Sequence, residues 1–212
     1  MTDHLAGVLA DAARGVFPPS DGSVHVLPPP SPRDSGIIAL TACSLVFADV
    51  DERWVRDLLP PDDLSAPLNP PFLRALEERT GRRVNNVDVL TVASRLDGPP
   101  PLELAPTEDR RHPRIVRALH HRDDVRAWTV PGGTVLLGRG VAGRWEVAVE
   151  VEPPARGTGL GRRLAVAARH LVPQGEPLWA QIAPGNAASV RAFLAADFLP
   201  VGAEALLVAD HA

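Results

Sequence analysis

The chain has 212 residues, of which 45% are apolar and 23% are charged, and its formal net charge is −4. This apolar content suffices for the core of one large domain or two small ones, and it excludes disorder as the main state. The chain has one cysteine and no lysine. It therefore cannot form an internal disulfide, a thiolate zinc site, a Schiff base or a lysine-dependent phosphate loop from its own residues.

The charge pattern and the apolar runs indicate a soluble cytoplasmic protein. No apolar stretch approaches the ~20 residues of a membrane span, and Asp11 and Arg14 lie where a signal peptide would be apolar. Residues 1–101 have a net charge of −5 and residues 102–212 a net charge of +1, so neither half has the basic face typical of nucleic-acid binding. The use of arginine in place of lysine, with many prolines, is typical of a GC-rich bacterial coding sequence.

The run Gly98–Pro101 interrupts regular structure and divides the chain into residues 1–98 and 102–212. In the first region, apolar spacing and turn residues predict a helix, a strand, two helices and a strand. In chain order these are a helix from Leu5, a strand over 36–50, a short helix capped by Asp51, a helix from Pro71 to Gly81, and a strand over 87–96. They predict an accessory α/β layer without an evident catalytic cluster.

The second region shows a more regular pattern of strands and helices. Gly132-Gly133 and the segment from Gly140 to Gly143 favour tight hairpins between three antiparallel strands. The expected elements are a short strand over 102–104, a helix from Pro113, strands over 125–130, 134–139 and 145–152, a helix over 160–171, a strand over 178–182, a helix over 186–196, and a strand over 205–209. The predicted fold class is α/β with a mixed sheet.

A glycine-rich turn, Arg156-Gly157-Thr158-Gly159-Leu160-Gly161-Arg162, joins the strand 145–152 to the following helix. Its glycines remove side chains where successive backbone N–H groups can form a concave nest, and the helix dipole favours an anion there. A dinucleotide fingerprint is excluded, because arginine and leucine occupy positions 162 and 164, where it requires glycine. The turn predicts a diphosphate site; a purely structural connection is the alternative.

This turn, the strand before it, the strand at Trp179 and the segment 186–194 together resemble the acetyl-CoA-binding core of the GCN5-related N-acetyltransferases (GNAT), over roughly residues 102–212. The resemblance implies acetyl-CoA as co-substrate, an amine acceptor and no metal. It implies that the turn holds the CoA pyrophosphate, and that the strand edge and the next helix contact the pantetheine arm. The cofactor-binding residues so implied are Val149, Val151, Arg156, Gly157, Thr158, Gly159, Leu160, Gly161, Arg162, Asn186 and Phe193.

Acyl transfer requires a base, an oxyanion stabiliser and an acid for the leaving thiolate. Strand periodicity places Glu146 and Glu150 on one face, where desolvation would raise the pKa of a carboxyl enough for it to act as base. The family comparison favours a glutamate on this strand, and we prefer Glu146; the alternative is pairing with Arg144 or Arg126 on a solvated face.

The acid is a departure from the family pattern. Family members often have a tyrosine at the place of Phe193, and this chain contains no tyrosine. Ser189, a water molecule or the solvent must then supply the proton.

The sequence therefore predicts an N-acetyltransferase that moves an acetyl or acyl group from acetyl-CoA directly to a primary amine. The acceptor is a small molecule or a peptide. The alternative is a catalytically impaired CoA-binding or protein-interaction module on the same fold. Residues 1–98 are expected to help shape the acceptor groove, with a degenerate half of the same fold as a further interpretation. Members of the family are often dimers, which leaves a homodimer open.

Overall fold

The computed structural model describes residues 4–209. Residues 1–3 and 210–212 lie outside the described part. Two compact units are present, which we describe separately. Unit 1 comprises the described residues up to Leu90 and from Val201 onward, and unit 2 is Thr91–Pro200. Both combine helices with a mixed or largely antiparallel sheet, which confirms the predicted α/β class with a mixed sheet. None of the described helices is long and apolar enough to cross a bilayer.

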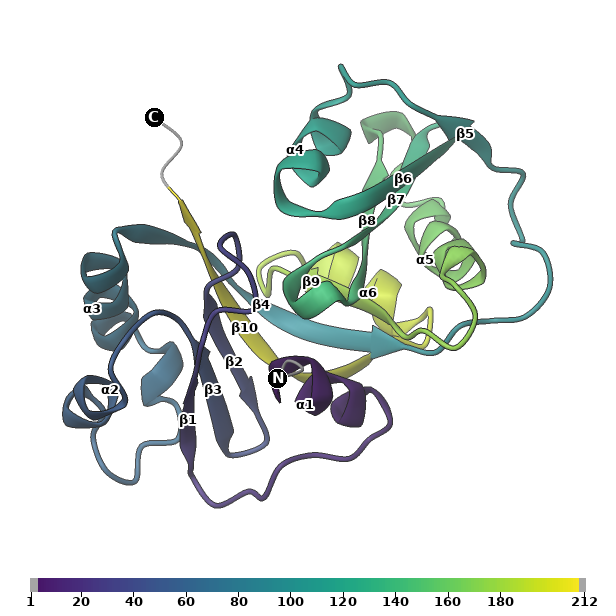
Figure 1. The fold of residues 1–212 in the computed structure, drawn as a ribbon. Helices are drawn as coiled ribbons and strands as arrows, with labels where there is room; N and C mark the ends of the chain where they lie inside the picture. Colours follow the sequence, from purple (N-terminus) through teal and green to yellow (C-terminus); the bar gives the residue numbers. More distant parts are fainter. Residues whose placement is uncertain (1–3, 210–212) are drawn as a thin grey trace. The chain divides into compact units, whose positions relative to one another are not determined.

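Unit 1 contains a sheet with the strand order β1-β3-β2-β10-β4 (Figure 1). Its elements are α1 (His4–Ala13), β1 (Val24–Leu27), β2 (Gly36–Leu40), β3 (Cys43–Phe47), α2 (Glu52–Leu58), the 3₁₀ turn Ala66–Leu68, α3 (Pro70–Thr80), β4 (Arg82–Ala93) and β10 (Leu199–Ala209). Its core joins apolar residues of β2, β3 and β10 to α2 and α3, around fully buried side chains such as Ile37, Val46 and Leu76. Strand β4 continues past Leu90 into unit 2.

Unit 1 departs from the sequence prediction at β1, at β2–β3, and at the starts of β10 and β4; β4 begins at Arg82, five residues earlier than expected. Residues 36–50, expected as one strand, form the antiparallel pair β2 and β3, which a two-residue turn with Ala42 at φ 49° connects. Strand β1 was not expected, because four residues with mixed burial give a weak signal. The last strand begins at Leu199, six residues earlier than expected, and pairs with β2 at Ala203–Ala39. This pairing places β10 in unit 1, whereas the sequence division groups it with residues 102–212.

Unit 2 carries the predicted glycine-rich turn. Its strand order is β4-β9-β8-β7-β6-β5, with β8 and β9 parallel and the pairs from β5 to β8 antiparallel. Its elements are β5 (Ala105–Thr107), α4 (Pro113–His121), β6 (Asp123–Val130), β7 (Gly133–Arg139), the 3₁₀ turn Val141–Gly143, β8 (Trp145–Val151), the 3₁₀ turn Pro153–Ala155, α5 (Leu160–Leu171), β9 (Leu178–Ile182) and α6 (Ala187–Leu194). The two hairpins predicted from glycines are present.

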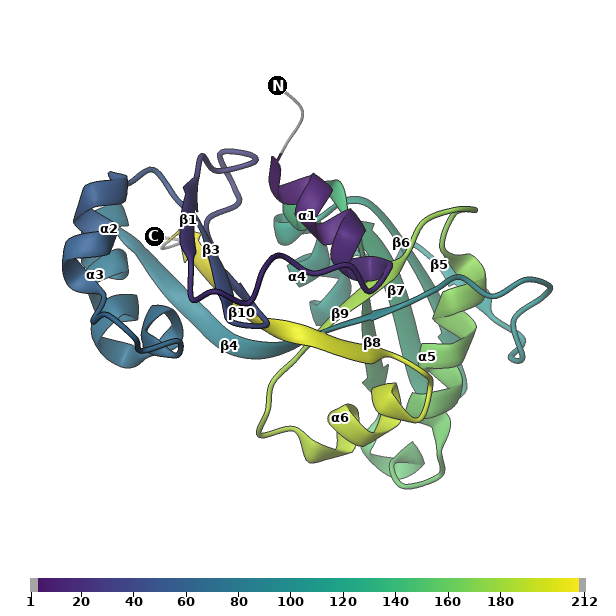
Figure 2. The same ribbon diagram turned by 90° about the horizontal axis from the view of Figure 1, so that it is seen from below.

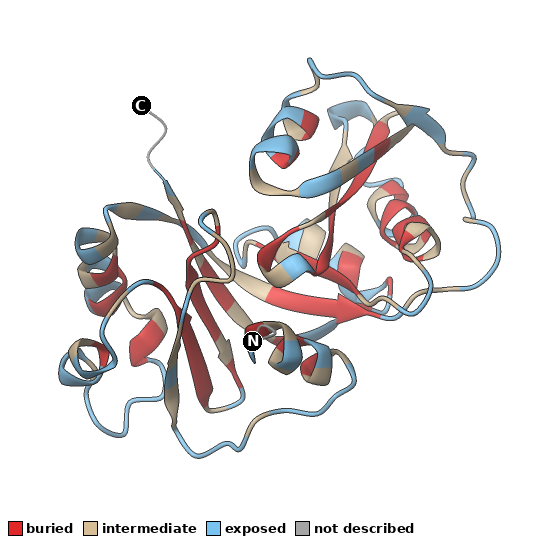
Figure 3. Ribbon diagram, in the orientation of Figure 1, coloured by how far each residue is buried: buried red, intermediate tan, exposed pale blue. Residues whose placement is uncertain are grey.

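The helices of unit 2 cover the two faces of its sheet. Val147 of β8 packs with Leu164 of α5 and Phe193 of α6 in the larger core. Figure 2 shows α5 beside the strands of this unit, and Figure 3 shows that α5 is buried along one side. Ala148 of β8 faces the opposite side and packs with Ile115 of α4. Alternate residues of β8 therefore point to opposite faces, as the strand periodicity predicts: the valines face α5 and α6, and the even-numbered residues face α4.

Candidate functional site

The glycine-rich turn between β8 and α5 is curled and exposed. Gly157 and Gly159 have φ of 78° and 79°, a left-handed conformation that costs side-chain-bearing residues about 1–2 kcal/mol. Residues 156–159 are exposed, and a Cβ at either of these glycines would meet no atom within 4 Å. The glycines are therefore required by backbone conformation, and they leave the backbone open to solvent.

The N-terminus of α5 lacks a side-chain cap. Gly159 is the N-cap residue and provides no side-chain acceptor. Among the hydrogen bonds of the described residues, the first N–H of this helix end to find an acceptor is that of Arg163, which bonds to the Gly159 carbonyl at 3.2 Å. The N–H groups before it are oriented as donors at the positive end of a twelve-residue helix, which is the arrangement that binds anions.

The side chains of the turn stabilise it or remain outside it. The Thr158 hydroxyl donates to the Ala155 carbonyl at 2.7 Å, and the Arg156 Nε donates to the Val151 carbonyl at 3.1 Å. Leu160 is buried in the core, while Arg162 is exposed on the helix. Thr158 and Leu160 therefore offer a ligand their backbone only, whereas the two arginines keep further guanidinium donors at the surface.

One edge of β8 is open along most of its length. β8 pairs with β9 at Trp145–Leu178 and Glu146–Trp179, and within the described residues this pairing does not continue along Val147–Val151. The opposite edge of β8 is fully paired with β7 over the same residues. The backbone of Val149 and the Val151 N–H thus lie on an edge that β9 does not cover, as an extended ligand that adds to a strand edge requires, while the Val151 carbonyl accepts from Arg156 Nε.

The open edge and the turn are adjacent. A Cβ at Gly161 would lie 3.6 Å from Val151 Cγ2 and 3.8 Å from Ala192 Cβ, so the start of α5 contacts both the end of β8 and helix α6. The structure therefore brings together the nest, the strand edge and α6, three of the segments implied to hold the cofactor.

Glu146, the preferred base, is buried on the α4 face with 3% of its surface exposed. Its Oε1 accepts from Arg144 Nε at 2.9 Å and from Gln181 Nε2 at 2.8 Å, and its Oε2 accepts from Arg122 Nε at 2.9 Å. Burial by itself would raise the pKa of this carboxyl, but the two guanidiniums outweigh that effect and lower it. The expectation of a raised pKa is therefore wrong: the pairing with Arg144 weighed as the alternative is present, but in a buried setting.

Glu150 lies on the same face, nearer the turn, and its side chain is 39% exposed. The Arg114 Nε of α4 donates to its Oε2 at 2.7 Å. This hydrogen bond lowers the pKa of the Glu150 carboxyl, assisted by the charges of Arg114, His112 and Arg156. The expectation of a raised pKa is wrong here too, but this carboxylate remains accessible.

Helix α6 places the remaining predicted residues. Asn186 is the N-cap, and its Oδ1 accepts from the Ser189 backbone N–H at 3.1 Å. Asn186 is exposed and Ser189 is half-buried. Phe193 is 7% exposed and packs edge-on against Phe198, with ring centroids 4.9 Å apart. Phe193 is thus part of the core.

Three side chains that partner the glutamates are not predicted from the sequence: Arg114, Arg122 and Gln181. Only Gln181 gave a usable signal, because it is the one polar residue of the strand Leu178–Ile182. The two arginines lie in and just after α4, where sequence spacing gives no indication of β8.

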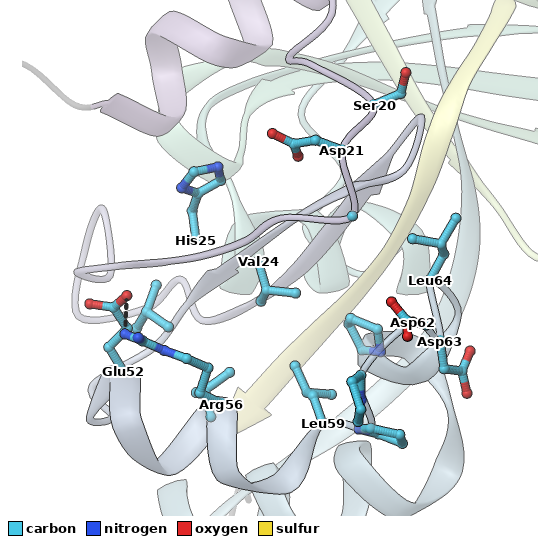
Figure 4. Close-up of a pocket in the computed structure, with 16 residues that line it drawn as sticks. Ser20, Asp21, Val24, His25, Glu52, Arg56, Leu59, Asp62, Asp63 and Leu64 are labelled. Carbon is cyan, nitrogen blue, oxygen red and sulfur yellow. Dashed lines mark hydrogen bonds and ion pairs between the residues drawn. The ribbon is translucent and has the colours of Figure 1, made fainter.

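A separate pocket of about 710 Å³ lies in unit 1, between the loop before β1 and the segment that follows α2 (Figure 4). Its acidic groups serve local structure. Asp21 accepts from the Ser23 N–H at 2.9 Å, Asp63 from Ser65, and Glu52 pairs with Arg56 at 2.6 Å. These contacts account for most of the charged side chains that line it.

Comparisons with known proteins give structural similarity alone. No protein-family model and no curated protein matches the chain. A GCN5-related N-acetyltransferase from Kribbella flavida aligns with a TM-score of 0.44 and 18% identity, over 67% of this chain and 65% of that one. A protein assigned to the GNAT family of acetyltransferases from Novosphingobium aromaticivorans aligns with a TM-score of 0.39 and 20% identity, over 60% of this chain and 66% of that one. The chain thus spans slightly less than two thirds of the length of each.

Proposed function

We propose that unit 2 is an acyltransferase of the GNAT type, which binds acetyl-CoA and transfers its acyl group to an amine. The observation that carries this proposal is the uncapped, left-handed turn at residues 156–161, in contact with the open edge of β8. Coenzyme A combines a diphosphate with an extended arm that contains two amides. A backbone nest and an unpaired strand edge are the two partners that these groups need.

In the proposed complex the N–H groups of Gly157–Arg162 donate to the diphosphate oxygens, and Arg156 and Arg162 add positive charge. The backbone of Val149 and Val151 hydrogen-bonds the pantetheine amides, next to Asn186 at the start of α6. Phe193 contributes by packing α6, because its ring lies in the core. The thioester then lies near the end of the strand that bears Glu150.

The proposed reaction is direct attack of the amine nitrogen on the thioester carbonyl carbon. A C–N bond forms, the C–S bond breaks, and the products are an amide and the CoA thiol. We propose that Glu150, the accessible carboxylate, binds the acceptor amine in its charged form; because the lowered pKa makes this carboxylate a weak base, the ammonium loses its proton to the bulk solvent and the neutral amine attacks. A proton from water or from the Ser189 hydroxyl reaches the thiolate, whose conjugate acid has a pKa near ~8.5.

The test is binding and turnover with three matched ligands. Isothermal titration should show binding of acetyl-CoA and of CoA, and an affinity for pantetheine, which lacks the diphosphate, lower by at least about 100-fold. Release of free CoA thiol in the presence of primary amines should then identify the acceptor class. Equal affinity for CoA and pantetheine would contradict the diphosphate site.

A second candidate is a CoA-binding module without catalytic activity. Two observations favour it: the chain has no tyrosine, and the pKa of both glutamates is lowered. This candidate is supported over the transferase if acetyl-CoA binds and no amine causes thiol release at any pH between 6 and about 9, a range over which the neutral fraction of an amine rises.

A further inference from the structure

The point where β9 leaves β8 is occupied by a polar network of two buried residues, Arg144 and Glu146, and two half-buried ones, Arg122 and Gln181, which we call the fork network. Glu146 is the last residue of β8 that pairs with β9, and its partner in the register is Trp179. Gln181 lies two residues further along β9, on the strand that no longer follows β8. Its amide nevertheless reaches back to the Glu146 carboxylate at 2.8 Å.

Side-chain bonds thus replace the backbone ladder at this point. Arg122 donates to Glu146 at 2.9 Å and to the Gln181 Oε1 at 3.4 Å, so one guanidinium contacts both strands. Arg144 donates to Glu146 and lies over the ring of Trp179, with 5.4 Å from its Cζ to the ring centroid. The Gln181–Glu146 bond joins β8 to β9, Arg122 joins both strands to the segment after α4, and Arg144, directly before β8, contacts β9 through the Trp179 ring.

The neighbouring backbone leaves space for this network. A Cβ at Gly140 would lie 2.2 Å from the Glu146 Cδ, and a Cβ at Gly138 would lie 2.9 Å from the Arg122 Cβ. Because any side chain at these positions would displace the network, both glycines are required by close approach. Glu146, Arg144 and Arg122 have side chains 13% exposed or less, so the network is held in one arrangement and is shielded from solvent.

We propose that the fork network sets how far β9 diverges from β8, and that Glu146 and Gln181 are positioning residues for the strand edge that takes the acyl donor. The proposal rests on the proposed function for the identity of the donor. It assigns no proton transfer to Glu146, which is buried away from solvent with both oxygens occupied by donors. The network acts by keeping the edge of β8 beyond Glu146 apart from β9 and at a fixed spacing.

The decisive variant is Gln181→Met, which removes the amide contacts to Glu146 and Arg122 with little change of volume and leaves Glu146 paired with its arginines. We expect the KM for acetyl-CoA and the Kd for CoA to rise about tenfold, the loss typical of one or two buried hydrogen bonds. The kcat should stay within about twofold, and the pH profile of kcat should be unchanged. Thr129→Val, which removes a hydrogen bond between β6 and β5 at 3.5 Å, is the control and should leave all four quantities unchanged.

A second readout does not depend on catalysis. Hydrogen exchange of the peptides that contain Trp145–Val151 and Leu178–Ile182 should accelerate in Gln181→Met and stay unchanged in Thr129→Val. Unchanged exchange and unchanged CoA affinity in Gln181→Met would overturn the positioning role. A folded Glu146→Gln that loses kcat while its CoA affinity is retained would overturn it as well, because it would make Glu146 the base.

These outcomes separate the two proposals. If the wild-type protein binds no CoA, the proposed function fails, and hydrogen exchange alone decides whether the network fixes the fork. If the wild type binds CoA and Gln181→Met binds it equally well with unchanged exchange, the proposed function stands and the network inference fails.

Discussion

The two ends of strand β8 are built in opposite ways. After its last residue, the turn at 156–161 consists of exposed backbone, and its side chains point into the core, bond back to the turn or stay at the surface. At its first residues, the fork network consists of buried and half-buried side chains held by charge-assisted hydrogen bonds. The turn therefore tolerates changes of side chain but not of backbone conformation. The fork network tolerates neither the loss nor the addition of a charge.

The largest effect on stability is expected at the buried end. Glu146→Gln leaves two buried guanidiniums without a counter-charge, so the free energy of unfolding should fall by about 3–5 kcal/mol. Urea unfolding followed by circular dichroism measures this loss. Glu152→Gln changes an exposed carboxylate just beyond the same strand, and it should change stability by less than about 0.5 kcal/mol. Equal losses in the two variants would show that the fork network contributes nothing specific.

The pH dependence of the free energy of unfolding gives a second test of the Glu146→Gln variant. The folded-state pKa of Glu146 lies below its ordinary value of 4.5, so the unfolded chain binds the proton more tightly. Its stabilisation is therefore complete above about pH 4.5 and is lost as pH falls through the lower folded-state pKa. The stability difference between wild type and Glu146→Gln should accordingly be constant near neutral pH and shrink in acid. A difference that grows on acidification would contradict the ion pairing.

At the exposed end, the largest effect is expected on binding. Gly159→Glu places a carboxylate at the proposed diphosphate site and forces a side chain into φ 79°. The Kd for CoA should rise by at least about 100-fold, because the carboxylate occupies the N–H groups and repels the phosphates. Gly175→Glu is a matched control: Gly175 has φ 80° and open space around it, in the turn before β9. It should carry the same backbone strain, about 1–2 kcal/mol, without loss of affinity.

The two ends of β8 also differ in how far the sequence predicts them: the turn is predicted, and the fork network is not. Glycines at 157, 159 and 161 lie next to each other in the sequence and directly encode the turn, so the turn and α5 are predicted with their bounds. Arg122, Glu146 and Gln181 are far apart in the sequence and meet only when α4, β8 and β9 are in place. Their pairing reverses the direction of the pKa shift expected from burial alone.

The same reasoning explains the errors in the fold. The turn between β2 and β3 contains Thr41 and Ala42, neither of which is a typical turn residue, so the hairpin gave no signal. The first residues of β4 and β10 are exposed or half-buried, and the apolar pattern begins later in both strands. Sequence periodicity therefore located the buried part of each strand and missed its exposed end.

A smaller effect, on turnover of the amine, is expected at Glu150, which lies between the two ends of β8. Glu150→Gln removes the accessible carboxylate proposed to hold the ammonium, so kcat/KM for the amine should fall about tenfold while the Kd for CoA stays unchanged. Glu108→Gln, an exposed carboxylate before α4, is the control and should leave both values unaltered. A loss of CoA affinity in Glu150→Gln would instead assign Glu150 to the donor site.

The smallest effect is expected at Phe193, the position at which the resemblance to the GNAT proteins implies a tyrosine that acts as acid. The ring is 7% exposed and packs edge-on against Phe198, so a hydroxyl added to it enters the larger core of unit 2. Phe193→Tyr should therefore lower the free energy of unfolding by about 1 kcal/mol and leave kcat within twofold of the wild type. Urea unfolding and thiol release measure the two quantities. A tenfold rise in kcat would show that the hydroxyl reaches the leaving sulfur, and that α6 moves outward from the core when the donor binds.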